Sequence, residues 1–102
     1  MPRPENVTNE DIARWSEIID NDPLITPILA STAIIREVLY AGQWLVDRLD
    51  EVNCPDHIIG RILYTAGALS FGRKDPWEVH QEILQQFKNG SLIFEPEPDN
   101  LN

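Results

Sequence analysis

The chain has 102 residues and a net charge of -9, from 17 acidic and 8 basic side chains. This length fits one small domain with a single core, and the negative charge opposes the phosphate neutralisation on which direct DNA or RNA binding relies. The acidity lies mostly at the ends, because residues 1–22 hold six acids against two arginines, and residues 95–102 hold three acids and no base.

Two features bear on the compartment. Cys54 is the only cysteine, so an intramolecular disulfide is excluded and nothing indicates an oxidising environment. Residues 1–6 lack the apolar run of a signal peptide, and the most apolar stretch is interrupted by Arg36 and Glu37. We therefore expect a cytoplasmic protein without a membrane span.

The first predicted helix follows a flexible segment, residues 1–7. Thr8 has the position of an N-cap, and Asp11 three residues later gives a carboxylate variant of the capping box. Residues 21–23 have the composition of a turn, so the helix should end near Asp20. Its apolar positions recur at helical spacing and are Ile12, Trp15 and Ile19.

A long second helix is predicted from Thr26 and Pro27 to about Val52. Thr26 fits an N-cap and Pro27 the first helical position, where its missing N–H is harmless. A seam at steps of three and four is typical of helix packing, and further apolar residues lie off it. The helix is therefore either the central element of a bundle or shared with a second copy in a homodimer. The seam comprises Ile28, Ser31, Ile35, Val38, Gly42, Leu45, Leu49 and Val52, while Leu29, Ile34, Leu39, Trp44 and Val46 lie off it.

A third predicted helix begins at Pro55 and carries Gly60 and Gly67 on one side, two turns apart. Glycine in a helix interior costs about 1 kcal/mol relative to alanine. The pair therefore predicts a close backbone approach to another helix, with Gly42 as the candidate partner.

The fourth predicted helix has the clearest start signal, with Asp75 as cap, Pro76 at the first position and Glu78 three residues after the cap. Asn89 and Gly90 tolerate the left-handed conformation that ends a helix. The chain is thus predicted to be all-α, a small four-helix bundle-like domain over residues 8–90. Acidic flexible ends flank it, with residues 91–102 forming a short apolar segment and an acidic tail.

Candidate metal ligands are poorly spaced. His80 lies two residues from both Glu78 and Glu82, so the three side chains point to different faces of the helix. Asp47 and Asp50 share a face, but such a pair is usually a solvated surface. We expect neither a metal nor another cofactor.

The candidate nucleophile is Cys54, which precedes a predicted helix N-terminus where the helix dipole would lower a thiol pKa. His57 is three residues away, but no oxyanion or third-group motif accompanies the pair. We therefore expect no catalytic residue and no enzymatic activity.

The C-terminal segment carries an apolar triplet followed directly by acids. An extended apolar strip beside carboxylates is typical of a peptide that adds a strand to a partner's sheet edge. The alternative is that the triplet folds back over the end of the bundle, because a small domain needs every apolar contact. Together with Trp44, which lies off the main seam, the candidate partner-binding residues are Leu92, Ile93, Phe94, Glu95 and Glu97.

These observations favour a non-enzymatic protein-interaction or regulatory module. It would self-associate, or bind a protein partner, through apolar helix surface and the C-terminal segment. An alternative is an acidic inhibitor of a basic nucleic-acid-handling protein, of the antitoxin, immunity or phage-encoded type. A third hypothesis is a small helical enzyme that uses Cys54 or surface carboxylates.

Overall fold

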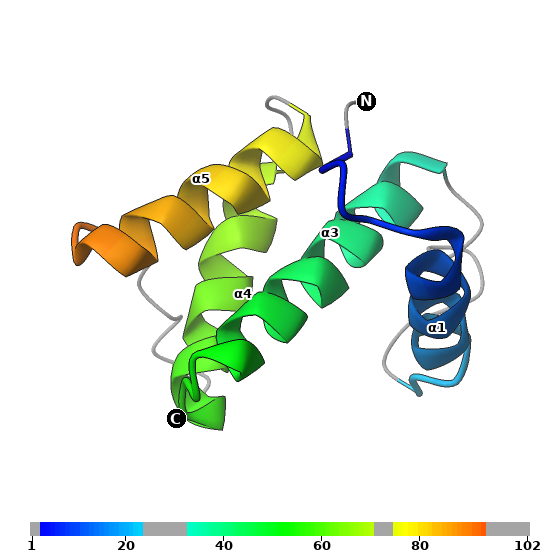
Figure 1. The fold of residues 1–102 in the computed structure, drawn as a ribbon, viewed down its shortest axis with the longest axis horizontal. Coiled ribbons are helices and arrows are strands. Elements are labelled where there is room, and N and C mark those ends of the chain that lie inside the picture. The colour runs from blue at the N-terminus through cyan, green and yellow to red at the C-terminus, as the bar shows by residue number, and fades with distance from the viewer. Residues whose placement is uncertain (1–2, 24–32, 71–74, 94–102) are drawn as a thin grey trace.

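The structure is a computed structural model that describes residues 3–23, 33–70 and 75–93 (Figure 1). Within these residues there are four α-helices and no strand. This confirms the predicted all-α class and the four-helix domain. The helices are α1 (Asn9–Asp20), α3 (Ala33–Glu51), α4 (Asp56–Ser70) and α5 (Pro76–Asn89).

Two helices begin where their capping residues predict. Thr8 Oγ1 accepts a hydrogen bond from the Asp11 N–H at 3.1 Å, and the Thr8 N–H donates to Asp11 Oδ2 at 3.0 Å, which completes the capping box of α1. Asp75 Oδ1 accepts a hydrogen bond from the Trp77 N–H at 2.9 Å, and Pro76 occupies the first turn of α5. The free backbone N–H groups at these two ends are thereby partly satisfied.

The C-terminal ends of α3 and α5 use residues with positive φ. Asn53 has φ 58°, and the Cys54 N–H donates to the Leu49 carbonyl at 3.1 Å. Gly90 ends α5 with φ 72°, as the sequence predicts. The long predicted helix therefore ends at Glu51, and its predicted start at residues 26–27 lies outside the described residues.

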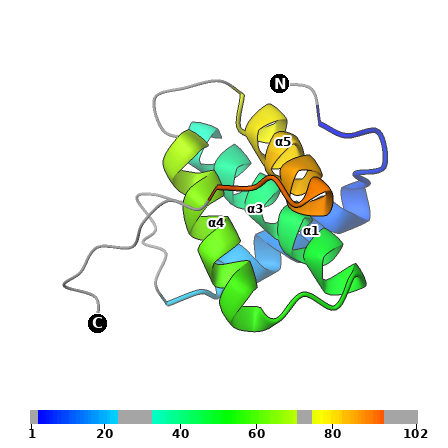
Figure 2. The same ribbon diagram turned by 90° about the vertical axis from the view of Figure 1, so that its left-hand side faces the viewer.

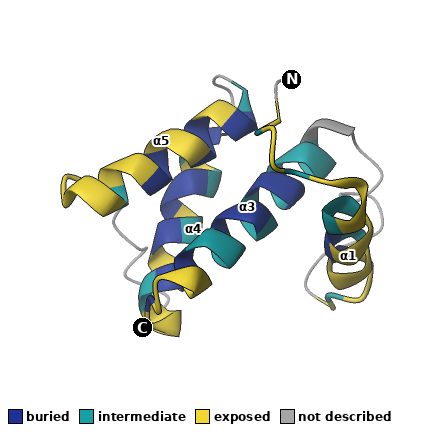
Figure 3. Ribbon diagram, viewed as in Figure 1, coloured by how far each residue is buried: buried dark blue, intermediate teal, exposed yellow. Residues whose placement is uncertain are grey.

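α3 is the central helix of the domain. It packs against α1, α4 and α5, which lie around it in both views (Figures 1 and 2). The buried faces of α3, α4 and α5 are turned toward one another, whereas the outer side of α1 is exposed (Figure 3). Of the two predicted roles for the long helix, the structure gives it that of the bundle's central element. Self-association through it stays a prediction.

The buried face of α3 differs in part from the predicted seam. Leu45 and Leu49 are fully buried as predicted, but Val38 and Gly42 are only half-buried and Val52 is 50% exposed. A seam at steps of three and four describes contact with one neighbour, whereas α3 has three. The residues of α3 that join the core are Tyr40, Ala41, Trp44, Leu45 and Leu49.

The predicted close approach at the glycines of α4 is wrong. Among the described residues, a Cβ added at Gly60 or Gly67 would meet no atom within 4 Å, and one at Gly42 would meet only Leu63 Cδ2 at 3.9 Å, an ordinary contact. Gly60 is exposed, so it lies on the outside of α4 rather than at a helix interface. Within the described ranges, no neighbouring backbone requires a glycine at either position of α4.

Candidate functional site

Three tryptophans from three helices meet in the core. The ring centroids of Trp15 on α1 and Trp77 on α5 are 6.4 Å apart, and those of Trp44 on α3 and Trp77 are 6.5 Å apart in an edge-on arrangement. Such tilted and edge-on pairs are favoured beyond the apolar area that they bury. Trp77, which is fully buried, therefore joins α1 and α3 to α5.

Trp44 does not have the exposed surface expected of a partner-binding residue. It is only 5% exposed, and its Nε1 is buried without a hydrogen-bond partner among the residues that the structure describes. The reason is the central position of α3, because residues off its predicted seam are covered by other helices. Binding of a partner through Trp44 stays untested, but the observation that motivated it no longer holds.

Asp47 on α3 binds two side chains of α1. The Trp15 Nε1–H donates to Asp47 Oδ2 at 3.0 Å, and Arg14 Nη2 donates to the same oxygen at 2.8 Å. Arg14 also reaches Asp11 Oδ1 at 3.4 Å. The indole N–H of a buried tryptophan usually has an acceptor, and for Trp15 α3 supplies it. Asp47 therefore links α1 to the central helix through hydrogen bonds.

Glu37 on α3 has the same two kinds of partner, drawn from different segments. The Trp77 Nε1–H of α5 donates to Glu37 Oε2 at 2.5 Å. Arg3, which precedes α1, donates through Nε to Oε2 at 3.4 Å and through Nη2 to Oε1, a two-pronged contact with the carboxylate. Burial by itself would raise the pKa of Glu37, but the hydrogen bonds from Arg3 and Trp77 lower it overall.

Tyr40 lies one turn from Glu37 and contacts two arginines. The Arg3 guanidinium carbon is 5.8 Å from the Tyr40 ring centroid, and that of Arg36 is 5.4 Å away. The Tyr40 hydroxyl accepts a hydrogen bond from Arg36 Nε at 2.8 Å and lies 2.8 Å from Ser16 Oγ. Glu37 and Tyr40 together surround the Arg3 guanidinium with a carboxylate and an aromatic face.

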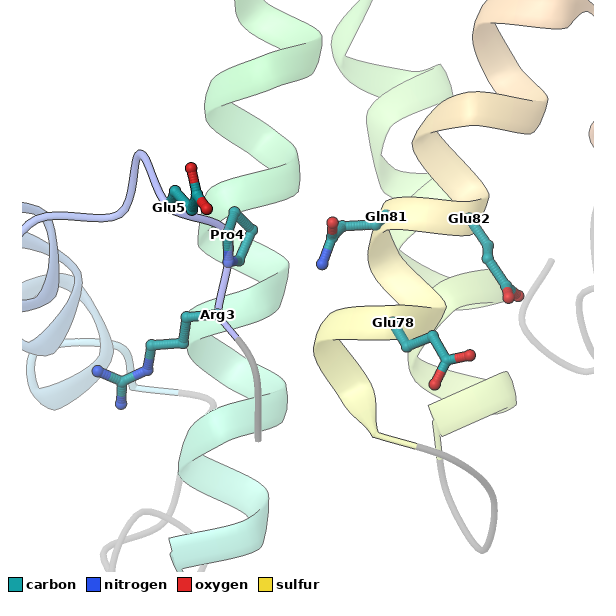
Figure 4. Close-up of a pocket in the computed structure, with 6 residues that line it drawn as sticks. All are labelled: Arg3, Pro4, Glu5, Glu78, Gln81 and Glu82. Atoms are coloured by element: carbon teal, nitrogen blue, oxygen red, sulfur yellow. The ribbon is translucent and has the colours of Figure 1, made fainter.

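An open groove of about 460 Å³ lies between the segment before α1 and the outer face of α5 (Figure 4). Arg3 extends away from α5, and the side chains of Glu78 and Glu82 point away from Pro4 (Figure 4). Gln81 points across the gap toward Pro4 (Figure 4). The full lining is Arg3, Pro4, Glu5, Glu78, Gln81 and Glu82.

The structure separates the predicted residues of the C-terminal segment. Leu92 is half-buried and packs against the core, whereas Ile93 is 85% exposed. The fold-back alternative therefore holds for Leu92, and Ile93 presents apolar surface. Phe94, Glu95 and Glu97 lie outside the described residues.

Cys54 lacks the environment of an activated thiol. Burial, with smaller effects of Asp50 and Asp56, raises its pKa, and its Sγ donates to the Pro55 carbonyl oxygen at 3.8 Å. A nucleophilic cysteine needs the opposite shift. Among the described residues, no group of three or more His, Cys, Asp or Glu side chains is placed to hold a metal ion.

His80 is a buried histidine with a structural contact. It is 1% exposed, and its Nδ1 lies 2.7 Å from the Pro76 carbonyl oxygen one turn earlier on α5. Burial lowers its pKa, opposed in part by that hydrogen bond. His80 is therefore a core residue whose lowered pKa favours the neutral form of the ring.

The contacts of Arg3, Glu37 and Tyr40 were not predicted from the sequence. A signal for Glu37 exists, because a carboxylate that interrupts an apolar helix must find partners when the helix becomes central. No comparable signal exists for Arg3, since it lies outside any predicted helix and 34 positions from Glu37.

Comparison with known proteins gives no relative. No family model, no curated protein and no solved structure matches the chain. Among the described helices, none has the length and apolar character needed to cross a bilayer.

Proposed function

We propose that this chain is a small non-enzymatic interaction module that binds a basic segment of a partner protein in the groove between residues 3–5 and α5. The observation that carries the proposal is the composition of that groove. Three glutamates line it, while the guanidinium of Arg3 is paired with Glu37. An open groove lined by three carboxylates complements an extended segment rich in arginine or lysine.

The overall charge supports the same class of partner. A net charge of -9 attracts a basic protein over several ångströms and raises its association rate at low salt. The negative charge of Glu78 and Glu82 lies on the exposed side of a well-capped helix, which holds the groove wall in place. Exposed Ile93, just beyond the end of α5, offers apolar contact to a longer partner.

The test is titration of a fluorescein-labelled oligo-arginine peptide, followed by anisotropy at low and high salt. Glu5, Glu78 and Glu82 are replaced together by glutamine. The matched control removes three charges from other exposed positions, as Glu10→Gln, Glu17→Gln and Asp50→Asn. We expect the groove variant to lose at least about tenfold in affinity, since each charge-assisted contact contributes measurably, and the control to stay close to the unmodified chain.

Inhibition by acidic mimicry is the second candidate, favoured by the number of acids outside the groove. A mimic uses carboxylates spread over its surface rather than one groove. In the same titration, equal losses in the groove variant and the control variant would favour mimicry. Equal affinity of all three chains for oligo-arginine would overturn both proposals.

A further inference from the structure

The side chains around Arg3 form a complete arginine-binding surface, here called the arginine acceptor and made of Glu37, Tyr40 and Trp77. Glu37 contacts the guanidinium through both carboxylate oxygens, and the Tyr40 ring lies 5.8 Å from the guanidinium carbon. The Trp77 indole N–H fixes Glu37 by a hydrogen bond at 2.5 Å. A planar guanidinium fits this arrangement better than an ammonium group, because it offers a donor fork and a flat face.

The acceptor is rigid, whereas its occupant is not part of a helix. Glu37 and Tyr40 lie on the central helix, and Trp77 is fully buried in the first turn of α5. Arg3 lies in the segment before α1, and its side chain is 40% exposed. Exposed ion pairs contribute little to stability, so Arg3 can leave the acceptor without unfolding the helices.

The acceptor adjoins the acidic groove. Arg3 belongs to both, since it contacts Glu37 and also lines the groove with Pro4 and Glu5. The Arg3 guanidinium extends away from α5 (Figure 4), so a basic segment lying in the groove would contact the segment that carries Arg3.

We propose that an arginine of the partner's basic segment binds the arginine acceptor, and that Arg3 is an internal competitor which must leave first. This inference rests on the proposed function, because it names the residue type that the groove selects. The segment before α1 then acts as a regulator of the site. Any event that removes Arg3 from the acceptor strengthens binding of the partner.

Arg3→Ala and Arg14→Ala form a matched pair of variants for the test. Each removes one arginine from an α3 carboxylate and changes the net charge equally, but only Arg3 competes for the acceptor. Labelled oligo-arginine is titrated into both variants and into the unmodified chain. If Arg3 occupies the acceptor about nine-tenths of the time, its removal should strengthen binding about tenfold. Arg14→Ala should change it less than about twofold.

Three further measurements make the result specific. Adding Glu37→Gln to Arg3→Ala should abolish the gain, and oligo-lysine should gain less than oligo-arginine from Arg3→Ala. In nitrogen–proton correlation spectra, oligo-arginine should move the indole N–H signal of Trp77, which contacts Glu37, and leave that of Trp15, which contacts Asp47. Circular dichroism verifies folding, and Arg3→Lys replaces Arg3→Ala if the latter unfolds.

The outcomes separate the inference from the proposed function. If oligo-arginine binds the unmodified chain but Arg3→Ala behaves like Arg14→Ala, the inference is wrong and the groove proposal stands. If oligo-arginine binds none of the chains, the proposed function fails and the inference with it.

Discussion

Glu37 and Asp47, two carboxylates on the same helix, make similar contacts with different consequences. Each accepts an indole N–H from a buried tryptophan and pairs with an arginine. At Asp47 both donors come from α1, so formation of that helix brings them together. At Glu37 the tryptophan comes from α5 and the arginine from a segment outside any helix. An arginine placed by a helix is preorganised for its contact, whereas one on an extended segment can be exchanged for an arginine from outside.

The contacts of Glu37 with Trp77 and Arg3 are called here the Glu37 cluster, and those of Asp47 with Trp15 and Arg14 the Asp47 cluster. The largest expected effect comes from Trp77, because it contributes to both clusters. It donates to Glu37 and packs against Trp15, the donor to Asp47. Trp77→Ala should cost about 3–5 kcal/mol of unfolding free energy, the range for removal of a large buried aromatic. Urea unfolding measures it, with Trp77→Phe as a milder variant.

Tyr64 provides the control for that measurement. It lies on α4 and is 43% exposed, so Tyr64→Ala should change stability by less than about 0.5 kcal/mol. Equal losses of unfolding free energy in Trp77→Ala and Tyr64→Ala would show that Trp77 does not link the clusters.

Thr8→Ala addresses the Asp47 cluster alone. Loss of the cap of α1 should cost about 1 kcal/mol and allow the first turn to fray. Hydrogen exchange at the Trp15 indole should then become faster, while exchange at the Trp77 indole should change little. Thr8→Asp keeps a capping side chain and should retain most of the stability. Faster exchange at both indoles would mean that the two clusters open together.

Gly60→Ala should stabilise the chain, so that Glu37 variants of lower stability stay folded when they are made in the Gly60→Ala chain. Gly60 lies inside α4, and an added Cβ meets no atom of the described residues within 4 Å. The gain should be about 0.4–1 kcal/mol, mainly from a less flexible unfolded chain. Gly90→Ala is the opposite control, because φ 72° at that position disfavours alanine and should make the variant less stable. A lower stability of Gly60→Ala would instead support the predicted close approach of another helix at Gly60.

Local signals predicted the ends of the helices well. Thr8 and Asp75 cap α1 and α5, and Gly90 ends α5, because each residue satisfies backbone groups of its own helix. Such contacts depend on neighbours in sequence, so the sequence carries them directly. The number of described helices was predictable for the same reason.

Contacts between distant segments were not predictable. Trp44 was expected on a surface because it lies off the seam of α3, but a helix with three neighbours has no free apolar face there. The Arg3–Glu37 contact joins residues 34 positions apart and leaves no periodic pattern. Of the candidate site, the acidic character was evident from composition, while the place where it gathers depended on the packing of α5 beside residues 3–5.

The smallest predicted effect is the acid dependence of the Glu37 contact. Its pKa in the folded chain lies below the ordinary value of 4.5, because hydrogen bonds from Arg3 and Trp77 outweigh burial. Between the two pKa values the unfolded chain binds more protons than the folded chain. The contact therefore stabilises the fold above pH 4.5, and its contribution disappears as pH falls through the folded pKa. Since the pair is partly exposed, the contribution should not exceed about 1 kcal/mol.

Urea unfolding of the unmodified chain and of Glu37→Gln, at neutral pH and well below pH 4.5, measures this contribution as a difference. The subtraction removes the effect of His80, whose pKa is lowered mainly by burial and which therefore destabilises the fold as pH falls below 6.5. We expect the difference in unfolding free energy between the two chains to become smaller in acid. At neutral pH, added salt should also make this difference smaller. If this difference in unfolding free energy depends on neither pH nor salt, Glu37 stabilises the fold by packing. Arg3 would then have no carboxylate to compete for.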